Sequence, residues 1–207
     1  MQLESERLIL RRFDADSESD VADSFAIYSQ PEVMRFLSSA PVTDIDAHRA
    51  RIRERTRSFE SLNDGTGIWA MVERETERIV GTLLLKRLPR SDSDFFTSDE
   101  PRRPWVPSND PASLSDDHEI GWHLHPTRWG KGYVTEGARA LIRYGFDDLK
   151  LPLLHAVVDS ANERSIAVTR RLGMSHRGQT RAYYNSVTEH FVLPPEPRPQ
   201  SPTVPPL

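Results

Sequence analysis

A strand, a short loop with two glycines and an amphipathic helix follow one another in this chain, and this unit constrains the fold most. It runs Glu119-Ile-Gly-Trp-His-Leu-His-Pro-Thr-Arg-Trp-Gly-Lys-Gly-Tyr-Val-Thr-Glu136. Glycines just before a helix let the backbone curl around an anion, and the unpaired N–H groups of the first turn carry partial positive charge. The unit therefore predicts a phosphate or diphosphate site, with Arg128, Lys131 and Thr135 adding charge and a hydroxyl. The alternative is a tight strand-to-helix turn without a ligand.

Two familiar nucleotide motifs do not fit this loop. The third glycine of a dinucleotide-binding fingerprint is missing, and so is the Gly-Lys-Ser/Thr sequence of a P-loop. The balance of 27 basic and 31 acidic residues gives a formal net charge of -4, which argues against a general nucleic-acid binder. Without cysteine, disulfides, thiolate metal sites and a cysteine nucleophile are excluded. No stretch approaches the roughly 18 apolar residues of a membrane span or resembles a signal peptide, so we expect a cytoplasmic protein.

Hydrophobic periodicity predicts a chain that mixes helices and strands. Expected strands cover residues 8–13, 67–73, 78–88, 118–124, 153–159, 181–184 and 189–193. Expected helices cover residues 21–28, 43–62, 134–149 and 162–172. A capping-box pattern at Thr43-Asp-Ile-Asp46 opens the second helix, and Gly173 ends the last one. We expect one domain over residues 1–193 and, because seven of the last 14 residues are proline, a disordered tail over 194–207.

The segment at about 89–117 interrupts this pattern. It carries five prolines among serines and aspartates and shows no periodicity. Such a stretch cannot bury a core face, which predicts disorder or a long surface loop. The functional alternative is a lid over a substrate site, with Phe95, Phe96 and Trp105 as contacts.

Several ordered motifs together resemble one family. The loop Trp129–Glu136 is preceded by Gly121-Trp-His-Leu124 and followed by Asn162-Glu-Arg-Ser165 and Arg171-Leu-Gly-Met174, and the chain opens with Ser5-Glu-Arg-Leu-Ile-Leu-Arg-Arg12. These motifs resemble the GNAT acetyltransferases, in particular the branch that includes the ribosomal-protein N-terminal acetyltransferases. The resemblance implies an α+β fold of αβα layers. Its central mixed, mostly antiparallel sheet would have about six to seven strands, about four flanking helices and a V-shaped cofactor cleft.

By this resemblance the cofactor is acetyl-CoA. The backbone of the glycine loop would hold its diphosphate, through Arg128, Trp129, Gly130, Lys131, Gly132, Tyr133, Val134 and Thr135. The strand residues Trp122, His123 and Leu124 would pair with the pantetheine arm as an added strand does, with Asn162 near its amides. Two positions depart from the family pattern, which usually has Gln or Arg at Trp129 and Gly or Ala at Val134. The bulk of Val134 is expected to affect the packing of the loop.

Acetyl transfer requires a neutral amine and a proton for the leaving sulfur. Glu119 is the candidate base, because the resemblance places catalytic carboxylates on its strand; the alternative is a solvated strand-edge charge. His118 and His123 are weaker candidates for a relay. These two histidines and His125 do not make a plausible metal site, because no matching carboxylate accompanies them, so we expect no metal.

Ser165 is the candidate acid. Many family members carry a tyrosine seven residues after the helix-start asparagine, and here that position is Thr169. Ser165 lies close to where the sulfur is expected, although a hydroxyl there also fits a helix cap. Tyr183 and Tyr184 are neighbours on a predicted strand, so their side chains are expected on opposite faces and only one would reach the cleft.

The acceptor stays open between a protein N-terminal α-amine and a small-molecule amine, attacking directly in a ternary complex. An α-amine has a pKa near 7.7–8.0 and a lysine amine one near 10.4, so an α-amine needs only a weak base. The alternative function is a non-catalytic acyl-CoA-binding or sensing module. We expect no membrane or nucleic-acid partner, and a homodimer is left open. The five arginines spaced by two between His48 and Arg57 predict a solvated helix or a docking surface for an acidic substrate or the ribosome.

Overall fold

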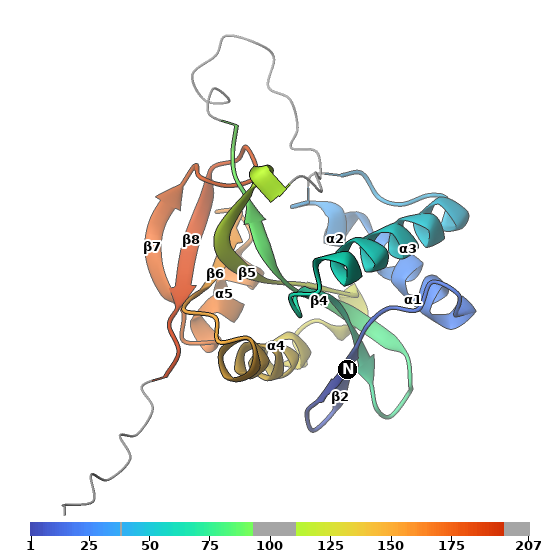
Figure 1. Cartoon of the computed structure of the whole chain (residues 1–207). Coiled ribbons are helices and arrows are strands. Elements are labelled where there is room, and N and C mark those ends of the chain that lie inside the picture. The colour runs from blue at the N-terminus through green and yellow to red at the C-terminus, as the bar shows by residue number, and fades with distance from the viewer. Residues whose placement is uncertain (38, 93–110, 197–207) are drawn as a thin grey trace, which may run out of the picture.

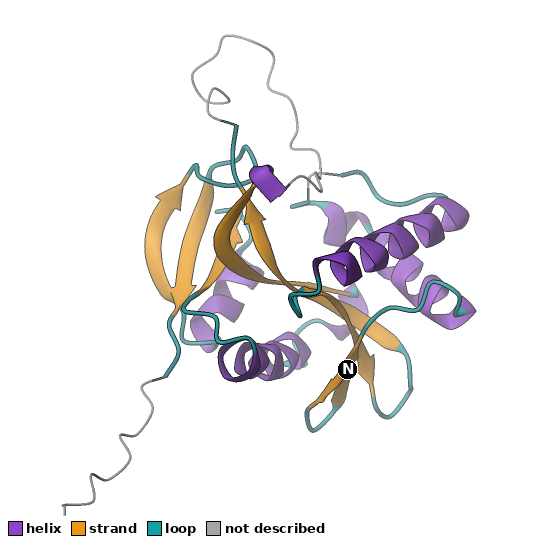
Figure 2. Ribbon diagram, in the orientation of Figure 1, coloured by secondary structure: helices purple, strands orange, loops and turns teal. Residues whose placement is uncertain are grey.

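The computed structural model describes residues 1–37, 39–92 and 111–196, which form one mixed sheet with helices on both faces (Figures 1 and 2). The strand order is β1-β2-β3-β4-β5-β6-β8-β7. The strands are β1 Gln2–Glu4, β2 Leu8–Arg11, β3 Gly67–Glu73, β4 Ile79–Pro89, β5 Leu114–Leu124, β6 Leu154–Val158, β7 Ser175–Thr180 and β8 Thr188–Leu193. The α-helices are α1 Glu18–Tyr28, α2 Pro31–Met34, α3 Ile45–Leu62, α4 Tyr133–Arg143 and α5 Glu163–Arg171. None of the helices in these ranges is long and apolar enough to span a membrane.

Alternation along the strands gives the sheet two apolar faces. Trp69 and Met71 of β3 face α4, while Ala70 and Val72 face α1 and α3. Figure 1 accordingly shows α1 and α3 together on one side of the strands and α4 on the other. The sheet therefore separates the side of the glycine loop, which leads into α4, from the side of the arginine-rich helix α3.

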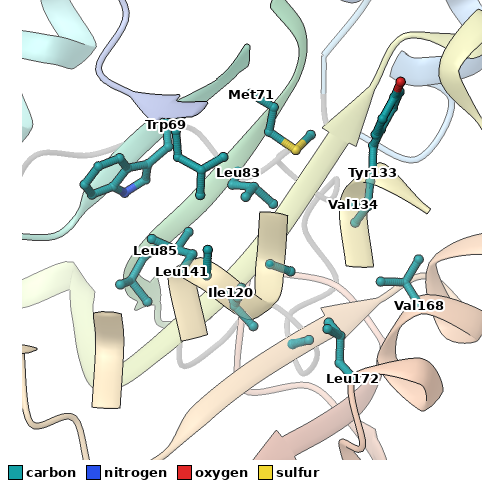
Figure 3. Packing of buried hydrophobic residues seen from close by; sticks show 14 of the residues in the cluster. Trp69, Met71, Leu83, Leu85, Ile120, Tyr133, Val134, Leu141, Val168 and Leu172 are labelled. Carbon is teal, nitrogen blue, oxygen red and sulfur yellow. The ribbon is translucent and has the colours of Figure 1, made fainter. Parts of the chain in front are cut away.

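The main core lies between the sheet and helices α4 and α5 (Figure 3). Leu83, Ile120 and Leu141 are fully buried there. Gly137 lets α4 come close to the sheet, because a Cβ atom at this position would lie 3.1 Å from Leu83 Cδ1 and 3.2 Å from Met71 Sδ. This close packing fixes the start of α4, and with it the glycine loop.

The ends of α3 follow from local hydrogen bonding. The cap at its start is Asp44 rather than Thr43, and its carboxylate accepts the N–H of Ala47 at 2.8 Å. At its end, Asn63 adopts the left-handed conformation with φ of 48°. The predicted helix is thus confirmed with its cap moved by one residue.

The fold class is confirmed, and the described residues form eight strands rather than six to seven. The strand expected over residues 181–184 is wrong, because β7 is Ser175–Thr180, an edge strand whose polar sequence shows no apolar alternation. The loop expected up to residue 117 ends earlier, since a 3-10 turn at Pro111–Ser113 leads into β5 at Leu114. Residues 93–110 and 197–207 lie outside the described residues, and with them the predicted lid contacts Phe95, Phe96 and Trp105 and most of the predicted tail.

Replacing Gly137 with Ala should destabilise the protein by about 1–3 kcal/mol, since the added methyl group overpacks the contact between α4 and the sheet. The control is Gly145→Ala, where the nearest atom to the new Cβ would lie at an ordinary 3.5 Å. Urea unfolding of both variants measures the difference. Equal stabilities for the two variants would contradict this account of the core.

Candidate functional site

The beginning of β6 pairs with the middle of β5, and the pairing is short. They run parallel, with His118 opposite Leu154 and Glu119 opposite His155, and no register pair follows. Beyond this point β5 continues along β4 as far as Leu124, while β6 pairs with β8 on its other edge. The two strands therefore diverge and leave a V-shaped cleft of about 1390 Å³ between them.

The glycine loop closes the wide end of this cleft. Gly130 and Gly132 have φ of 77° and 80°, in the region that favours glycine, and Gly132 is the N-cap of α4. Trp129 holds the loop to β5 by donating its indole N–H to the carbonyl of Leu124 at 2.9 Å. The guanidinium of Arg164 lies 4.3 Å from the centre of its ring. The open N-terminus of α4 thus lines the cleft, as an anion site requires.

A buried glutamate of β3 fixes the start of the loop. Glu73 is 5% exposed, accepts a hydrogen bond from Arg128 at 2.9 Å and contacts the hydroxyl of Tyr133. Burial acts to raise its pKa, but hydrogen bonds from Tyr133 and Thr76 and the charge of Arg128 lower the pKa overall. Arg128 is thus bound to Glu73 and is not among the residues that line the cleft.

A second carboxylate fixes the end of the loop. Glu136 accepts hydrogen bonds from the hydroxyl of Ser5 and from the backbone N–H and Nε of Arg7, each at 2.7 Å. Arg7 also donates to the carbonyl of Lys131 at 3.0 Å. The Ser5-Glu-Arg7 motif therefore ties the turn between β1 and β2 to the loop. Lys131, predicted to add charge, does not line the cleft.

Positive charge in the cleft comes from other residues. Six arginines line it: Arg7, Arg35, Arg139, Arg143, Arg164 and Arg171. Sequence reasoning missed these arginines, although Arg139 and Arg143 are four apart on α4 and so lie on one face of the helix. Val134 also lines the cleft and is otherwise buried in the core cluster that includes Val168 of α5. Its bulk is thus accommodated inside the molecule.

Glu119 lies at the vertex of the cleft and is 7% exposed. Its Oε2 accepts from the hydroxyl of Tyr184 and lies 3.3 Å from Nζ of Lys86, the residue opposite on β4. Lys86 also donates to the hydroxyl of Tyr184 at 2.6 Å. The other oxygen, Oε1, lies 3.6 Å from where a Cβ at Gly121 would be. A Cβ there would make only an ordinary van der Waals contact with Oε1, and Glu119 is among the residues that line the cleft.

The two tyrosines do not lie on a strand, so the prediction that they point to opposite faces is wrong. Tyr184 and Asn185 have φ of 60° and 51° and form a left-handed turn. As a result both phenols reach the same face of β5, where Tyr183 donates to Asp117 at 2.7 Å and Tyr184 binds Glu119. Burial raises the pKa of Tyr184 well above its usual value, so its hydroxyl remains a hydrogen-bond donor.

Ser165 lines the cleft at the start of α5. The helix cap is Asn162, whose side-chain oxygen accepts the backbone N–H of Ser165 at 3.1 Å. The hydroxyl of Ser165 accepts the indole N–H of Trp122 at 3.3 Å. Its own proton is therefore available on the cleft side. Thr169 is fully buried and donates to the carbonyl of Ile166 at 2.8 Å, so it cannot replace the family's tyrosine.

The histidines of β5 are dispersed. His123 lines the cleft and its Nδ1 lies 2.9 Å from the hydroxyl of Tyr28. Burial, together with the charges of Arg55 and Lys86, lowers its pKa to about 4, so its ring is neutral near pH 7. Over the described residues, no three histidine, aspartate or glutamate side chains are grouped closely enough to hold a metal ion.

Comparisons with known proteins agree on one fold. The acetyltransferase (GNAT) domain family matches residues 7–175. An uncharacterized N-acetyltransferase of Bacillus licheniformis is 26% identical over 181 residues, 87% of this chain and 86% of that protein. The GNAT-family acetyltransferase structure from Bacillus anthracis has a TM-score of 0.67 at 19% identity, covering 94% of this chain and 98% of that one. A structure from Vibrio cholerae, named as a candidate ribosomal-protein-serine acetyltransferase, has a TM-score of 0.65 at 18% identity, with coverages of 94% and 98%.

Replacing Glu73 with Gln should loosen the loop, because Arg128 and Tyr133 lose a charged partner. Amide hydrogen exchange over residues 128–133 should become faster, while the exposed Glu75→Gln control should leave it unchanged. Lowering the pH should also make amide exchange over residues 128–133 faster in the wild type. The lowered pKa of Glu73 means that its stabilisation is present above the unfolded value near 4.3 and is lost as the pH falls through the folded value. Unchanged exchange in Glu73→Gln would show that other contacts hold the loop.

Proposed function

Because this chain belongs to the GNAT acetyltransferase family, we propose that it transfers an acetyl group from acetyl-CoA to the primary amine of a protein N-terminus or a small molecule. The observation that carries the proposal is the position of Glu119. Its carboxylate lies where β5 and β6 separate and lines the cleft, with Oε2 held by Tyr184 and Lys86.

The cleft fits acetyl-CoA in its shape and its charge. Its lining includes the N-terminus of α4 and six arginines, which suit a diphosphate and a further phosphate group. Its inner walls are the separated edges of β5 and β6, and an extended ligand arm can hydrogen-bond to such an edge as a strand would. When bound there, acetyl-CoA supplies the thioester carbonyl that an amine attacks.

Trp122, His123 and Leu124 would therefore hold the pantetheine arm, and residues Trp129 to Thr135 the diphosphate. The direct contacts proposed for Arg128 and Lys131 are limited to their backbone, because the side chain of Arg128 binds Glu73 and that of Lys131 does not line the cleft. Asn162 would lie beside the arm at the start of α5.

Glu119 would accept a proton from the amine, directly or through one water molecule. Tyr184 and Lys86 donate towards a single oxygen, which stabilises the charge of a buried carboxylate and fixes its orientation. A base of this kind suits an α-amine, which is partly neutral at pH 7, better than a lysine amine.

Ser165 would donate its hydroxyl proton to the departing sulfur. Trp122 donates to the serine oxygen, which leaves the hydroxyl hydrogen to point elsewhere. Glu119 and Ser165 both line the cleft, where they would act as proton acceptor and proton donor. A non-catalytic CoA-binding module would not need both, so this pair favours an enzyme.

Replacing Glu119 with Gln should lower kcat roughly 10²- to 10⁴-fold by removing the base, with little change in the Kd for coenzyme A. Release of free thiol from acetyl-CoA, measured with a panel of peptides and small amines, gives the rate. Asp116→Asn is the matched control, because Asp116 lies on the same strand with its carboxylate in solvent. Cofactor binding without turnover on any amine would contradict the enzyme, and an unchanged rate in Glu119→Gln would remove Glu119 as the base.

Replacing Ser165 with Ala should lower kcat about 10²-fold if its hydroxyl donates the proton. The melting temperature should stay the same, because the cap of α5 uses the backbone N–H of residue 165, which alanine retains. Ser160→Ala, an exposed position before α5, is the control. A fall in melting temperature with unchanged kcat would assign Ser165 a structural role instead.

A further inference from the structure

Four of the five arginines of α3 fall into two sets. Arg49 and Arg53 are four residues apart and so share one face of the helix. Both bind carboxylates near the start of α1: Arg49 contacts Glu18 at 2.7 Å and Arg53 contacts Asp16 at 2.6 Å. This set ties α3 to α1 and has its charge compensated.

Arg51 and Arg55 form the second set, also four apart but on a different face. Within the described ranges, no carboxylate lies within ion-pair distance of either side chain. Two like charges at this spacing repel each other, at a small cost in stability. An anion held between them would offset that cost.

Both arginines line a cavity of about 400 Å³ between α3 and the sheet, on the face opposite α4. Its floor holds a third arginine, Arg12, which stacks over Trp69 at 4.1 Å and donates to backbone carbonyl groups. Glu60 is the one acidic residue lining the cavity against these three arginines. Apolar walls complete it: Phe13, Ile52, Phe59 and Ile68.

One bonded pair of side chains lies between this cavity and the cleft. Tyr28 lines the cavity and bonds to His123, which lines the cleft. His123 lies four residues after Glu119 on the same face of β5, a distance of about 13 Å along the strand. Burial and, after it, the nearby charge of Arg55 lower the pKa of His123. Arg55 also acts on Tyr184, the hydrogen-bond partner of Glu119, so its guanidinium lies near both ends of this stretch of β5.

We propose that the cavity binds an acidic group of the amine acceptor, with Arg51 and Arg55 holding a carboxylate that lies about 7–13 Å from the amine. Guanidinium groups bind carboxylates through two parallel N–H donors, and the apolar walls accept the carbon chain that carries the acid. The inference rests on the proposed function, because that function places the amine at Glu119. The preferred acceptor is thus an acidic peptide N-terminus or an amino acid with a distant carboxylate, and polyamines are disfavoured.

The test compares matched acceptors that differ only in charge. One arm uses the peptide amides Ser-Ala-Glu-Ala, Ser-Ala-Gln-Ala and Ser-Ala-Lys-Ala; the other uses 6-aminohexanoate and hexylamine. The wild type should favour the acidic member of each set about tenfold in kcat/KM. The double variant Arg51→Gln/Arg55→Gln should lose this preference through KM, with kcat retained. The arm with the larger preference identifies the peptide or the small molecule as the source of the acid.

The double variant Arg49→Gln/Arg53→Gln is the matched control, because it removes two charges from the same helix outside the cavity. It should retain the preference for acidic acceptors. Equal rates for acidic and neutral acceptors in the wild type, or a preference that survives in Arg51→Gln/Arg55→Gln, would overturn the inference and leave the acetyltransferase in place. If no amine is acetylated, calorimetric titration with the acidic and neutral peptides tests the cavity separately. Binding of the acidic peptide that depends on Arg51 and Arg55 would support the cavity while the proposed function fails. Absence of such binding would overturn both.

Discussion

The early end of the pairing between β5 and β6 determines most of what this protein can do. Two parallel pairs, the second at Glu119 and His155, hold the strands together, after which each strand bonds only to its other neighbour. The separation leaves backbone groups of both strands without a partner strand inside a folded sheet, which is unfavourable unless water or a ligand satisfies them. The short pairing of β5 and β6 thus creates the cleft and also leaves backbone groups in it that an extended ligand can hydrogen-bond.

Two carboxylates connect this cleft to the rest of the fold. Glu73 comes from β3 and Glu136 from the first turn of α4, and each binds an arginine that borders the loop, Arg128 and Arg7 respectively. The loop needs glycines to turn, which makes it flexible when free. Its shape is therefore imposed from outside, by residues far apart in the sequence that the sheet brings together. This explains why the Ser5-Glu-Arg motif at the start of the chain belongs with a loop more than 120 residues later.

The sequence was most informative where local physics decides the structure. The helix faces, the glycine loop and the position of Glu119 follow from spacing and from the resemblance to the family. The edge strand Ser175–Thr180 was not predictable in this way, because it has no buried apolar face. Backbone pairing with β8 holds it in the sheet instead. The partners of Glu119 were also missed. Lys86 becomes its neighbour only through the register of β4 and β5, and Tyr184 only through a left-handed turn.

The distribution of charge was also hidden in the sequence, for a related reason. A net charge of -4 gives no sign of positive surfaces, yet arginines of α4 and α5 line the cleft on one face of the sheet and those of α3 line a cavity on the other. Acidic side chains compensate arginines elsewhere, as Glu18 does for Arg49. On α3, the arginines paired with carboxylates and those that line the cavity thus lie on different faces. The net charge of the chain adds these regions together and so does not reveal them. In the proposed complex, the cofactor binds in the cleft and the acidic acceptor reaches Glu119 from the side of α3, so each negatively charged ligand has its own set of arginines.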